Sequence, residues 1–552
     1  MTAGVGIDTD AVGTADAGDG GRRGGSRTFA GTWTLVRFIA RLDRVRIALW
    51  IVGLALIITF SASSVDQLYP TEADLIEAAG PLEDNVAVIA LQGPTYAIDT
   101  LGGNIVFNIG GFGYVMTGLM GMFLVGRHTR GDEEQGRTEL LRATVVGRNA
   151  PVTAALVVAT AALAALGILI TLSMLSLDLP VTGSVSYGVA MAAFGMLFAA
   201  ATAVTAQVSE HNRAAYGLAG TLLGASFVIR AVGDVSGGSL SWLSPMGWAQ
   251  GMKPYAGERW WPLLLLLAGT AALVVLAYAL LARRDLGSGL VAPRPGPPRA
   301  APGLTRPWGL ALRLQRATVI AWATGLALTG LAYGSLGEDV ADIIGDNEEM
   351  ADIIAQVGGE LTDSYFASSL LMLAVIAGGF TISSALRLRS EEAGGRTEPL
   401  LAAVVTRSEW MASHLAVCLA GSVAILLAAG IGMGATYAVI VGDAAEIPRL
   451  TGAALGFAPA LWVLAGLVAA LFGLAPRAAA VAWALLAWCT VVGFLGELLG
   501  LPQWARNLSP FEHVPKMPVD AVDWVPLVLL TLVAAAATAI GLIGFRRRDI
   551  TA

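Results

Sequence analysis

Long apolar runs recur along the whole chain and are separated by shorter polar segments. A helix that crosses the hydrocarbon core of a bilayer needs about 20 mainly apolar residues. Any one such run could be the core helix of a soluble protein, but twelve of them favour an all-α integral membrane protein with twelve transmembrane helices. The first six predicted spans are Ile47–Val65, Ile105–Val125, Val152–Leu177, Val185–Val208, Ala214–Val232 and Pro262–Leu281. The second six are Thr318–Tyr333, Tyr365–Leu386, Trp410–Val441, Gly452–Leu474, Ala478–Leu499 and Val525–Phe545.

Lys and Arg gather on alternate connections between these runs. In helical membrane proteins both residues accumulate on the cytoplasmic loops. If the N-terminus lies inside, 28 of the 34 Lys and Arg residues are cytoplasmic. The pattern therefore predicts a multi-pass protein of the plasma membrane with both termini in the cytoplasm.

The two long outer connections have the opposite character. Residues 66–103 and Leu336–Ser364 contain no Lys or Arg but many acids, with apolar residues between them. This alternation predicts short amphipathic helices that cover the outer mouth. The acids form either a solvated face or a surface that gathers cations.

The composition supports a membrane protein and restricts its chemistry. Charged residues make up 14% of the chain, hydrophobic residues 55%, and the mean hydropathy is +0.68, whereas soluble proteins carry about 25% charged residues. Cys418 and Cys489 lie inside apolar runs and the four histidines are scattered, so we expect neither a disulfide framework nor a metal site. Residues 1–31 lack an apolar core, which excludes a cleavable signal peptide and predicts a disordered cytoplasmic tail.

One segment of the chain occurs twice. Gly131–Arg148 aligns without gaps on Ser390–Arg407, 259 positions later, and ten of the 18 positions are identical. Shorter matches follow the same order in both halves; they are Arg41-Leu42 with Arg313-Leu314, Arg213-Ala-Ala with Arg477-Ala-Ala, Leu243-Ser-Pro with Leu508-Ser-Pro, and Arg283-Arg-Asp with Arg547-Arg-Asp. With six spans in each half, the pattern predicts two parallel six-helix repeats related by an axis along the membrane normal.

A proline-rich stretch separates the two halves. Leu286–Pro307 contains six prolines, which prevent a continuous helix and make the stretch a semi-rigid spacer. The predicted organisation is a tail at 1–31, a first six-helix half at 32–285, a cytoplasmic linker at 286–307 and a second six-helix half at 308–552.

The sequence carries no recognisable catalytic machinery. It contains no phosphate-binding Gly-x-x-x-x-Gly-Lys loop, and its two lysines, Lys253 and Lys516, are predicted to lie outside. The spans also hold few ionisable residues that could relay protons; Arg230, His414 and Glu497 all fall near span ends. We therefore expect no catalytic residue and no cofactor on this chain, and an energy source supplied by a partner protein.

The duplicated segment is the predicted docking site for that partner. Each copy begins with acids, continues through Gly-Arg-Thr-Glu and ends with apolar residues at helical spacing. We expect its charged side chains to be exposed, and Arg137 to pair with Glu139 and Arg396 with Glu398. The alternative is an interfacial helix that only anchors the neighbouring span.

The Glu-Glu-x-x-Gly-Arg-Thr-Glu-Leu-Leu segment, the Leu-Ser-Pro elements and the Arg-Arg-Asp endings resemble those of ABC-2 type exporter permeases. The fused twelve-span form is similar to the actinobacterial antibiotic exporter permeases for tetronasin-type polyketides. The resemblance implies the type V exporter fold and two copies of a cytoplasmic ABC ATPase that bind ATP and Mg. It also implies that two coupling helices seat in those ATPases. Their residues would be Glu133, Glu134, Arg137 and Glu139 in the first copy, and Glu392, Arg396 and Glu398 in the second.

The same resemblance assigns three further elements. Thr32–Arg46 would be an amphipathic connecting helix, with Leu35, Phe38, Ile39 and Leu42 on its apolar face. Gly233–Gly257 and Gly500–Val519 would be short re-entrant helices on the outer side. The second copy departs from the first at Pro399 and Ala393, which predicts a shortened or kinked second coupling helix.

The expected function is export of lipophilic compounds, such as polyketides, antibiotics or other drugs, by the membrane subunit of an ATP-driven transporter. A proton-coupled multidrug carrier is the alternative, and a membrane scaffold or lipid-modifying protein is a third possibility. No partnership with nucleic acid is expected. The residues proposed to line the substrate pathway are Phe107, Tyr114, Met116 and Phe366.

Overall fold

A computed structural model describes residues 28–549, apart from 84–85, 143–145, 286, 292–295, 297, 338–360, 403–404 and 497–500. Most of the second predicted outer segment, and Glu497, therefore lie outside the described residues. The chain divides into two compact units, unit 1 at Met1–Pro295 and unit 2 at Gly296–Ala552. This division falls inside the proline-rich stretch.

The described residues form helices and turns and no strand, which confirms the all-α prediction. Within the described ranges, twelve helices are long and apolar enough to cross a membrane, six in each unit. The twelve-span prediction is confirmed, and several boundaries shift. The helix predicted at Thr318–Tyr333 begins at Pro307, and the span predicted at Gly452–Leu474 begins at Glu446 and is broken at Gly456 and Phe457.

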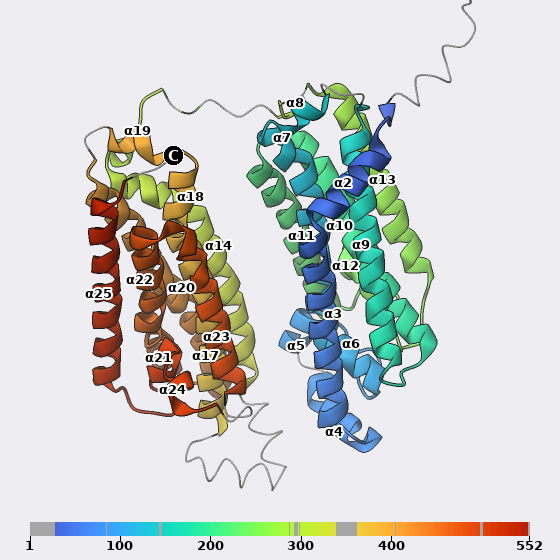
Figure 1. Cartoon of the computed structure of the whole chain (residues 1–552). Coiled ribbons are helices and arrows are strands. Elements are labelled where there is room, and N and C mark those ends of the chain that lie inside the picture. The colour runs from blue at the N-terminus through green and yellow to red at the C-terminus, as the bar shows by residue number, and fades with distance from the viewer. Residues whose placement is uncertain are drawn as a thin grey trace, which may run out of the picture. The chain divides into compact units, whose positions relative to one another are not determined.

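Unit 1 is a bundle of six long helices with short helices at its two ends (Figure 1). The long helices are α3 (Arg44–Leu68), α6 (Leu101–Gly126), α9 (Ala150–Leu175), α10 (Val181–Val208), α11 (Asn212–Val235) and α13 (Trp261–Arg283). The short elements are α2 (Thr32–Leu42), α4 (Glu72–Glu83), α5 (Val86–Gln92), the π-helix η1 (Arg127–Gly131), α7 (Asp132–Glu134), α8 (Arg137–Arg142), η2 (Leu240–Leu243) and α12 (Pro245–Gln250).

Unit 2 has the same plan. Its spans are α14 (Pro307–Ser335), α17 (Leu361–Ala385), α20 (Arg407–Val441), the broken helix α21 (Glu446–Leu455) with α22 (Ala458–Leu474), η4 (Pro476–Val481) with α23 (Ala482–Leu495), and α25 (Trp524–Arg547). Its short elements are η3 (Pro302–Thr305), α18 (Arg387–Ala393), α19 (Thr397–Leu401), α24 (Gln503–Arg506) and η5 (Pro510–His513).

Small residues bring the long helices of each unit close together. In unit 1, α10 packs against α6, α9, α11 and α13, and a Cβ added at Gly121 of α6 would lie 2.4 Å from the carbonyl oxygen of Gly195 in α10. In unit 2, a Cβ added at Gly473 of α22 would lie 2.2 Å from the carbonyl oxygen of Gly541 in α25. Such close backbone approach is how helices associate in lipid, where burial of apolar side chains supplies little driving force.

The helix α2 matches the predicted amphipathic connecting helix only in part. Leu35 and Ile39 are buried against α9, as expected for its apolar face. Phe38 and Leu42, assigned to the same face, are 55% and 48% exposed. Unit 2 has no separate counterpart, because α14 runs without a break from Pro307.

The end of each unit opposite the duplicated segment carries further short elements (Figure 1). In unit 1 the first predicted outer segment forms α4 and α5, and α4 buries Leu75 and Ala79. The elements predicted as re-entrant are η2 with α12 in unit 1, and α24 with η5 in unit 2. Ser244 caps α12 by accepting the backbone N–H of Met246 at 3.1 Å.

Candidate functional site: the duplicated segment

Both copies of the duplicated segment fold into a helix end, a tight turn and a second short helix. The turn glycines, Gly136 and Gly395, have φ of +71° and +66°, a left-handed conformation that side chains with a Cβ adopt only with strain. Their backbone N–H groups donate to the carbonyl oxygens of Glu133 and Glu392 at 3.0 and 2.9 Å. Two equivalent turns therefore shape the two copies. We call the end of each unit that carries this segment its repeat end; α7 and α8 mark it in unit 1, and α18 and α19 in unit 2 (Figure 1).

In unit 1, the carboxylate of Glu133 is fastened to the end of the sixth long helix. Arg284, which follows α13, donates from its two terminal nitrogens to the two carboxylate oxygens at 2.8 and 2.7 Å. The backbone N–H of Gly287 adds a hydrogen bond of 2.8 Å, and Arg130 lies 2.9 Å from the same carboxylate. Only 8% of the Glu133 side chain is exposed. A buried bidentate pair of this kind fixes both position and orientation.

Unit 2 contains the same pair. Arg548, which follows α25, donates to the Glu392 carboxylate at 2.7 Å, and 9% of the Glu392 side chain is exposed. The guanidinium group of Arg548 also lies over the rings of Phe472 and Phe545, at 5.1 and 5.5 Å from their centroids. Glu392 matches Glu133 in the duplication, and Arg548 matches the second arginine of the other Arg-Arg-Asp sequence. The buried pair of glutamate and arginine is therefore present in both halves.

The last arginine of each copy also returns to the sixth long helix of its unit. Arg148 donates to two carbonyl oxygens at the end of α13, at 2.6 and 2.7 Å. Arg407 donates to carbonyl oxygens at the end of α25, at 2.5 and 3.3 Å. A cation at this place satisfies free carbonyl groups and interacts favourably with the helix dipole. Each segment is thus attached to the sixth helix near both of its ends.

The predicted pairs Arg137–Glu139 and Arg396–Glu398 are wrong. Arg137 donates to Asp132 at 3.0 Å and Arg396 to Glu391 at 2.6 Å. The reason is geometric, because residues two apart on a helix do not face each other. The glycine turn instead brings each arginine back to the preceding helix. The hydrogen bond to Glu391 raises the pKa of Arg396 above its ordinary value, so this arginine stays charged.

The predicted docking residues fall into two groups by exposure. Glu133 and Glu392 were expected at the surface and are instead buried in the pairs described above. The other five form the exposed face of the two segments; they are Glu134, Arg137, Glu139, Arg396 and Glu398. Arg137 and Arg396 are 52% and 59% exposed although each is paired.

The two exposed faces differ at two positions. Glu134 lies 3.2 Å from His211 in unit 1, whereas the matching residue in unit 2 is Ala393. Pro399 lies in the first turn of α19, where its missing N–H costs no helical hydrogen bond. The short helix therefore forms in both units despite the proline.

The residues just before each segment contact the start of the first long helix of the unit. In unit 1, Asp43 is buried at the junction of α2 and α3, 2.6 Å from His128 and 3.3 Å from Arg127. In unit 2 the corresponding residue is Gln315, which is buried and accepts a hydrogen bond from Ser384. The repeat end thus joins the second helix to both the first and the sixth.

The residues predicted to line the substrate pathway are dispersed. Phe107 and Tyr114 border a cavity of only about 20 Å³ in unit 1, and Met116 lies partly buried in the unit 1 core. Phe366 is fully buried in unit 2, where its ring packs 4.7 Å from that of Tyr437. Their role in transport stays a prediction.

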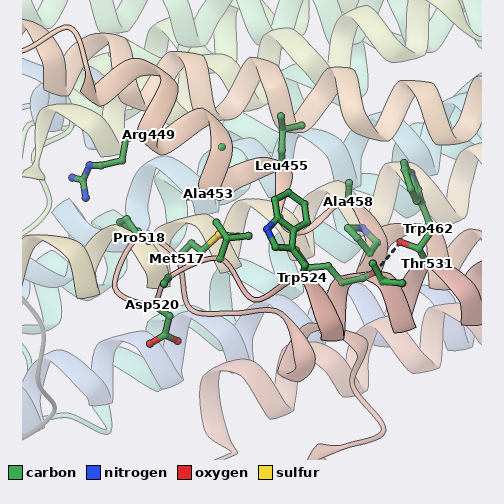
Figure 2. A pocket seen from close by; sticks show the side chains of 17 residues that line it. Arg449, Ala453, Leu455, Ala458, Trp462, Met517, Pro518, Asp520, Trp524 and Thr531 are labelled. Atoms are coloured by element: carbon green, nitrogen blue, oxygen red, sulfur yellow. Dashed lines mark hydrogen bonds between the residues drawn. The ribbon is translucent and has the colours of Figure 1, made fainter.

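A far larger pocket, of about 620 Å³, lies in unit 2 between α21, α22 and α25 (Figure 2). Because α25 runs from this pocket to Arg548, the pocket is at the end of unit 2 opposite the repeat end. The apolar pattern does not reveal it. A retrospective signal is the run of small residues Gly452, Ala453, Gly456 and Ala458, which leaves space beside the helix.

The arginines that attach the segments to the sixth helices were also not predicted from the sequence. Arg284 and Arg548 stand in the repeated Arg-Arg-Asp sequence, and Arg148 and Arg407 end the two aligned segments. The available signal was that both arginines of the first half have a match in the second half. No group of three or more His, Cys, Asp or Glu side chains in the described part of the chain is placed to hold a metal ion.

Comparison with known proteins identifies the family. Residues 304–546 match the family described as the C-terminal domain of the multidrug efflux system permease Rv1217c. The chain is 43% identical over 526 residues to the multidrug efflux system permease protein Rv1217c of Mycobacterium tuberculosis (strain ATCC 25618 / H37Rv), and the match covers 95% of this chain and 96% of that protein. The chain therefore belongs to the family of multidrug efflux permeases represented by Rv1217c.

Proposed function

We propose that this chain is the membrane subunit of an ABC-2 type exporter, which moves lipophilic compounds out of the cell with energy from a separate cytoplasmic ATPase. The relative named above is a multidrug efflux system permease, which supports export of drugs. The bias of Lys and Arg supports a cytoplasmic location for the repeat ends and for both termini, in the plasma membrane.

The observation that supports the proposal is the duplicated segment, which occurs once in each unit and is held there by buried contacts. Its buried face is attached to the sixth helix, and its opposite face offers exposed charges. The second helix, which leads into the segment, contacts the first. A rigid element with this arrangement can transmit movement of a partner to the long helices. Two such elements in one chain support a partnership with two ATPase copies, one at each segment, with ATP and Mg bound by the ATPases.

The buried charges offer less support for a proton-coupled carrier. Arg230 is fully buried, but its guanidinium group lies 3.4 Å from Asp234 and donates to the carbonyl oxygens of Ile89 and Leu91 at 3.2 Å. These contacts hold α5 against α11. They describe a structural attachment, and an attachment of this kind needs no proton transfer.

Charge reversal on the exposed faces tests the proposal. The double variant Glu139→Lys/Glu398→Lys changes two exposed side chains outside the buried pairs, so we expect unchanged folding and loss of ATPase co-purification and of ATP-driven export. The matched control is Glu77→Lys, which reverses an exposed acid on α4. If the double variant keeps its ATPase and exports normally, the segment is only an anchor and the docking assignment fails.

Cysteine labelling tests the orientation. An impermeant reagent added to sealed cells should label Glu77→Cys and leave Glu139→Cys unlabelled. Labelling at Glu139→Cys alone would place the repeat end outside and contradict the proposed coupling to a cytoplasmic ATPase.

A further inference from the structure

The pocket of unit 2 has the size and walls of a small-molecule site. Its volume of about 620 Å³ lies within the range of about 300–1,000 Å³ that is usual for such sites. Its walls are mostly apolar, from Leu455, Pro459 and Leu527 among others. Trp524 and Val528, which also line it, are 70% and 53% exposed, so the pocket opens on the surface of the unit. An opening of this kind on a lipid-facing surface would admit molecules dissolved in the lipid.

Two charged side chains line the pocket, Arg449 and Asp520. Arg449 is neutralised by two acids, since its guanidinium group lies 2.8 Å from Asp363 and 2.7 Å from Glu446. Asp520, on the loop before α25, accepts a hydrogen bond from the backbone N–H of Lys516 at 3.1 Å, and has no ion-pair partner among the described residues. Because the two acids that pair with Arg449 do not line the pocket, Asp520 is the charged lining residue left without a balancing charge. This arrangement favours a cation and disfavours an anion.

A tryptophan in the wall supplies the second polar feature. Trp462 lines the pocket, and its buried indole N–H has no acceptor in the described part of the chain. A buried donor without a partner is costly unless a ligand or water completes it. Indole rings also attract cations through their faces, and Trp462 and Trp524 both contribute to the wall (Figure 2).

The corresponding loop of unit 1 is built differently. Counted from the serine of the shared Ser-Pro pair, Tyr255 and Asp520 are both eleven residues on. The Tyr255 ring packs against Gly102 and Gly183, where an added Cβ would approach it to 2.5 and 2.2 Å, and its hydroxyl lies 3.0 Å from Ser184. The loop of unit 1 thus carries a large ring packed into the bundle, whereas that of unit 2 places a carboxylate beside an open pocket.

We propose that this pocket binds the exported compound, and that the compound is a lipophilic cation. Its apolar body would lie between α21, α22 and α25, its positive charge would face Asp520, and an acceptor on it would take the Trp462 N–H. This proposal rests on the export function proposed above, and adds to it a site and a chemical class.

Filling the pocket tests the site. A Cβ added at Gly452, which lines the pocket, meets no atom within 4 Å, so Gly452→Phe can enter the space without a backbone clash. The control is Gly325→Phe on α14, where an added Cβ also meets no atom within 4 Å. With the purified chain in phosphatidylcholine nanodiscs, we expect rhodamine 6G, measured by fluorescence polarisation, to bind wild type and Gly325→Phe alike. Binding to Gly452→Phe should weaken more than tenfold. Equal binding to all three proteins overturns the proposal.

Two milder variants test the assigned chemistry. Asp520→Asn keeps an acceptor for the backbone N–H and removes the charge, so affinity for rhodamine 6G should fall by about two- to fivefold, as for an exposed ion pair. Asp443→Asn, at another exposed acid that accepts a backbone N–H, should have no effect. Trp462→Phe should weaken binding by about two- to tenfold, as for one lost hydrogen bond. Fluorescein, an anion with a similar ring system, should not bind; tighter binding of fluorescein than of rhodamine 6G contradicts the charge assignment.

A bilayer lipid is the competing occupant. If phosphatidylethanolamine added to the nanodiscs displaces rhodamine 6G from wild type, the pocket is a lipid site and the proposal fails. ATPase co-purification with Gly452→Phe separates a failure of the proposed site from a failure of the proposed export function. A variant that keeps its ATPase but loses the probe supports the site. Normal probe binding by Gly452→Phe refutes the site while the export function stands, and loss of the ATPase from wild type itself would refute the export function.

Discussion

At the repeat end of unit 1, Glu133 receives hydrogen bonds from two nitrogens of Arg284, whereas in unit 2 Glu392 receives one from Arg548. The geometry differs in detail, yet the same two residues meet in both units. At the opposite ends, matching positions hold Tyr255, packed against two glycines, and Asp520, beside a pocket. The comparison indicates that the two halves share the attachment of the duplicated segment to the sixth helix, and that their opposite ends are built differently.

Removal of the buried arginines should have the largest effect on stability. Arg284→Ala leaves the Glu133 carboxylate buried without its main partner, which costs about 3–5 kcal/mol for pairs of this kind. The apparent melting temperature in detergent should fall clearly, whereas Arg283→Ala, at the exposed neighbour, should change stability by less than about 0.5 kcal/mol. Arg548→Ala should cost less than Arg284→Ala, because Glu392 loses one hydrogen bond and not two. Equal melting of Arg284→Ala and Arg283→Ala would show that the pair does not hold the segment.

Truncation of Tyr255 should have the next largest effect. Its hydroxyl is neutral and able to donate at physiological pH, and burial raises its pKa further, to about 12. Tyr255→Ala empties the space beside Gly102 and Gly183, and we expect a loss of about 2–3 kcal/mol, less than for a fully buried aromatic ring. Tyr255→Phe should cost about 1 kcal/mol through the contact with Ser184. Asp520→Ala should leave the melting temperature almost unchanged, and a loss as large as that of Tyr255→Ala would remove the proposed difference between the two loops.

Alanine in the two turns should have a smaller effect that is equal in both units. Gly136→Ala and Gly395→Ala place a Cβ in open space, so their cost comes from the left-handed backbone, about 1–2 kcal/mol. Gly325→Ala, in a helix and also in open space, should be neutral or stabilising by up to about 1 kcal/mol. Thermal melting of the three variants checks the ranking. If only one of the two turn variants lowered the melting temperature, the two turns would not be equivalent.

The amino-acid sequence was sufficient to predict the long helices, because a bilayer requires apolar residues over the whole length of a span. Each half thus showed its six spans, and the duplication indicated a candidate docking segment. The break at Gly456 and Phe457 was not predictable from hydropathy, because both residues are apolar enough to continue the run. The separation of α2 from α3 likewise depends on Asp43, whose buried contacts come from residues far along the chain.

The extent of the duplicated segment was predictable from the sequence, but its contacts were not, and its role as a docking site stays a prediction. Spacing within the segment favoured Arg137–Glu139, yet the left-handed Gly136 directs Arg137 toward Asp132. The partner of Glu133 lies 151 residues away, so only the fold could reveal it. The pocket of unit 2 depends on space left by small side chains between three helices, and such space has no signature in a hydropathy pattern.

The most direct test of the central account is the composition of the intact transporter. Because both fastened segments belong to one chain, native mass spectrometry of the purified complex should detect one copy of this chain with two ATPase subunits. The double variant Glu139→Lys/Glu398→Lys should release both ATPases while the chain itself stays folded. A complex with two copies of this chain for each pair of ATPases, or ATP-independent export by the chain alone, would contradict the account.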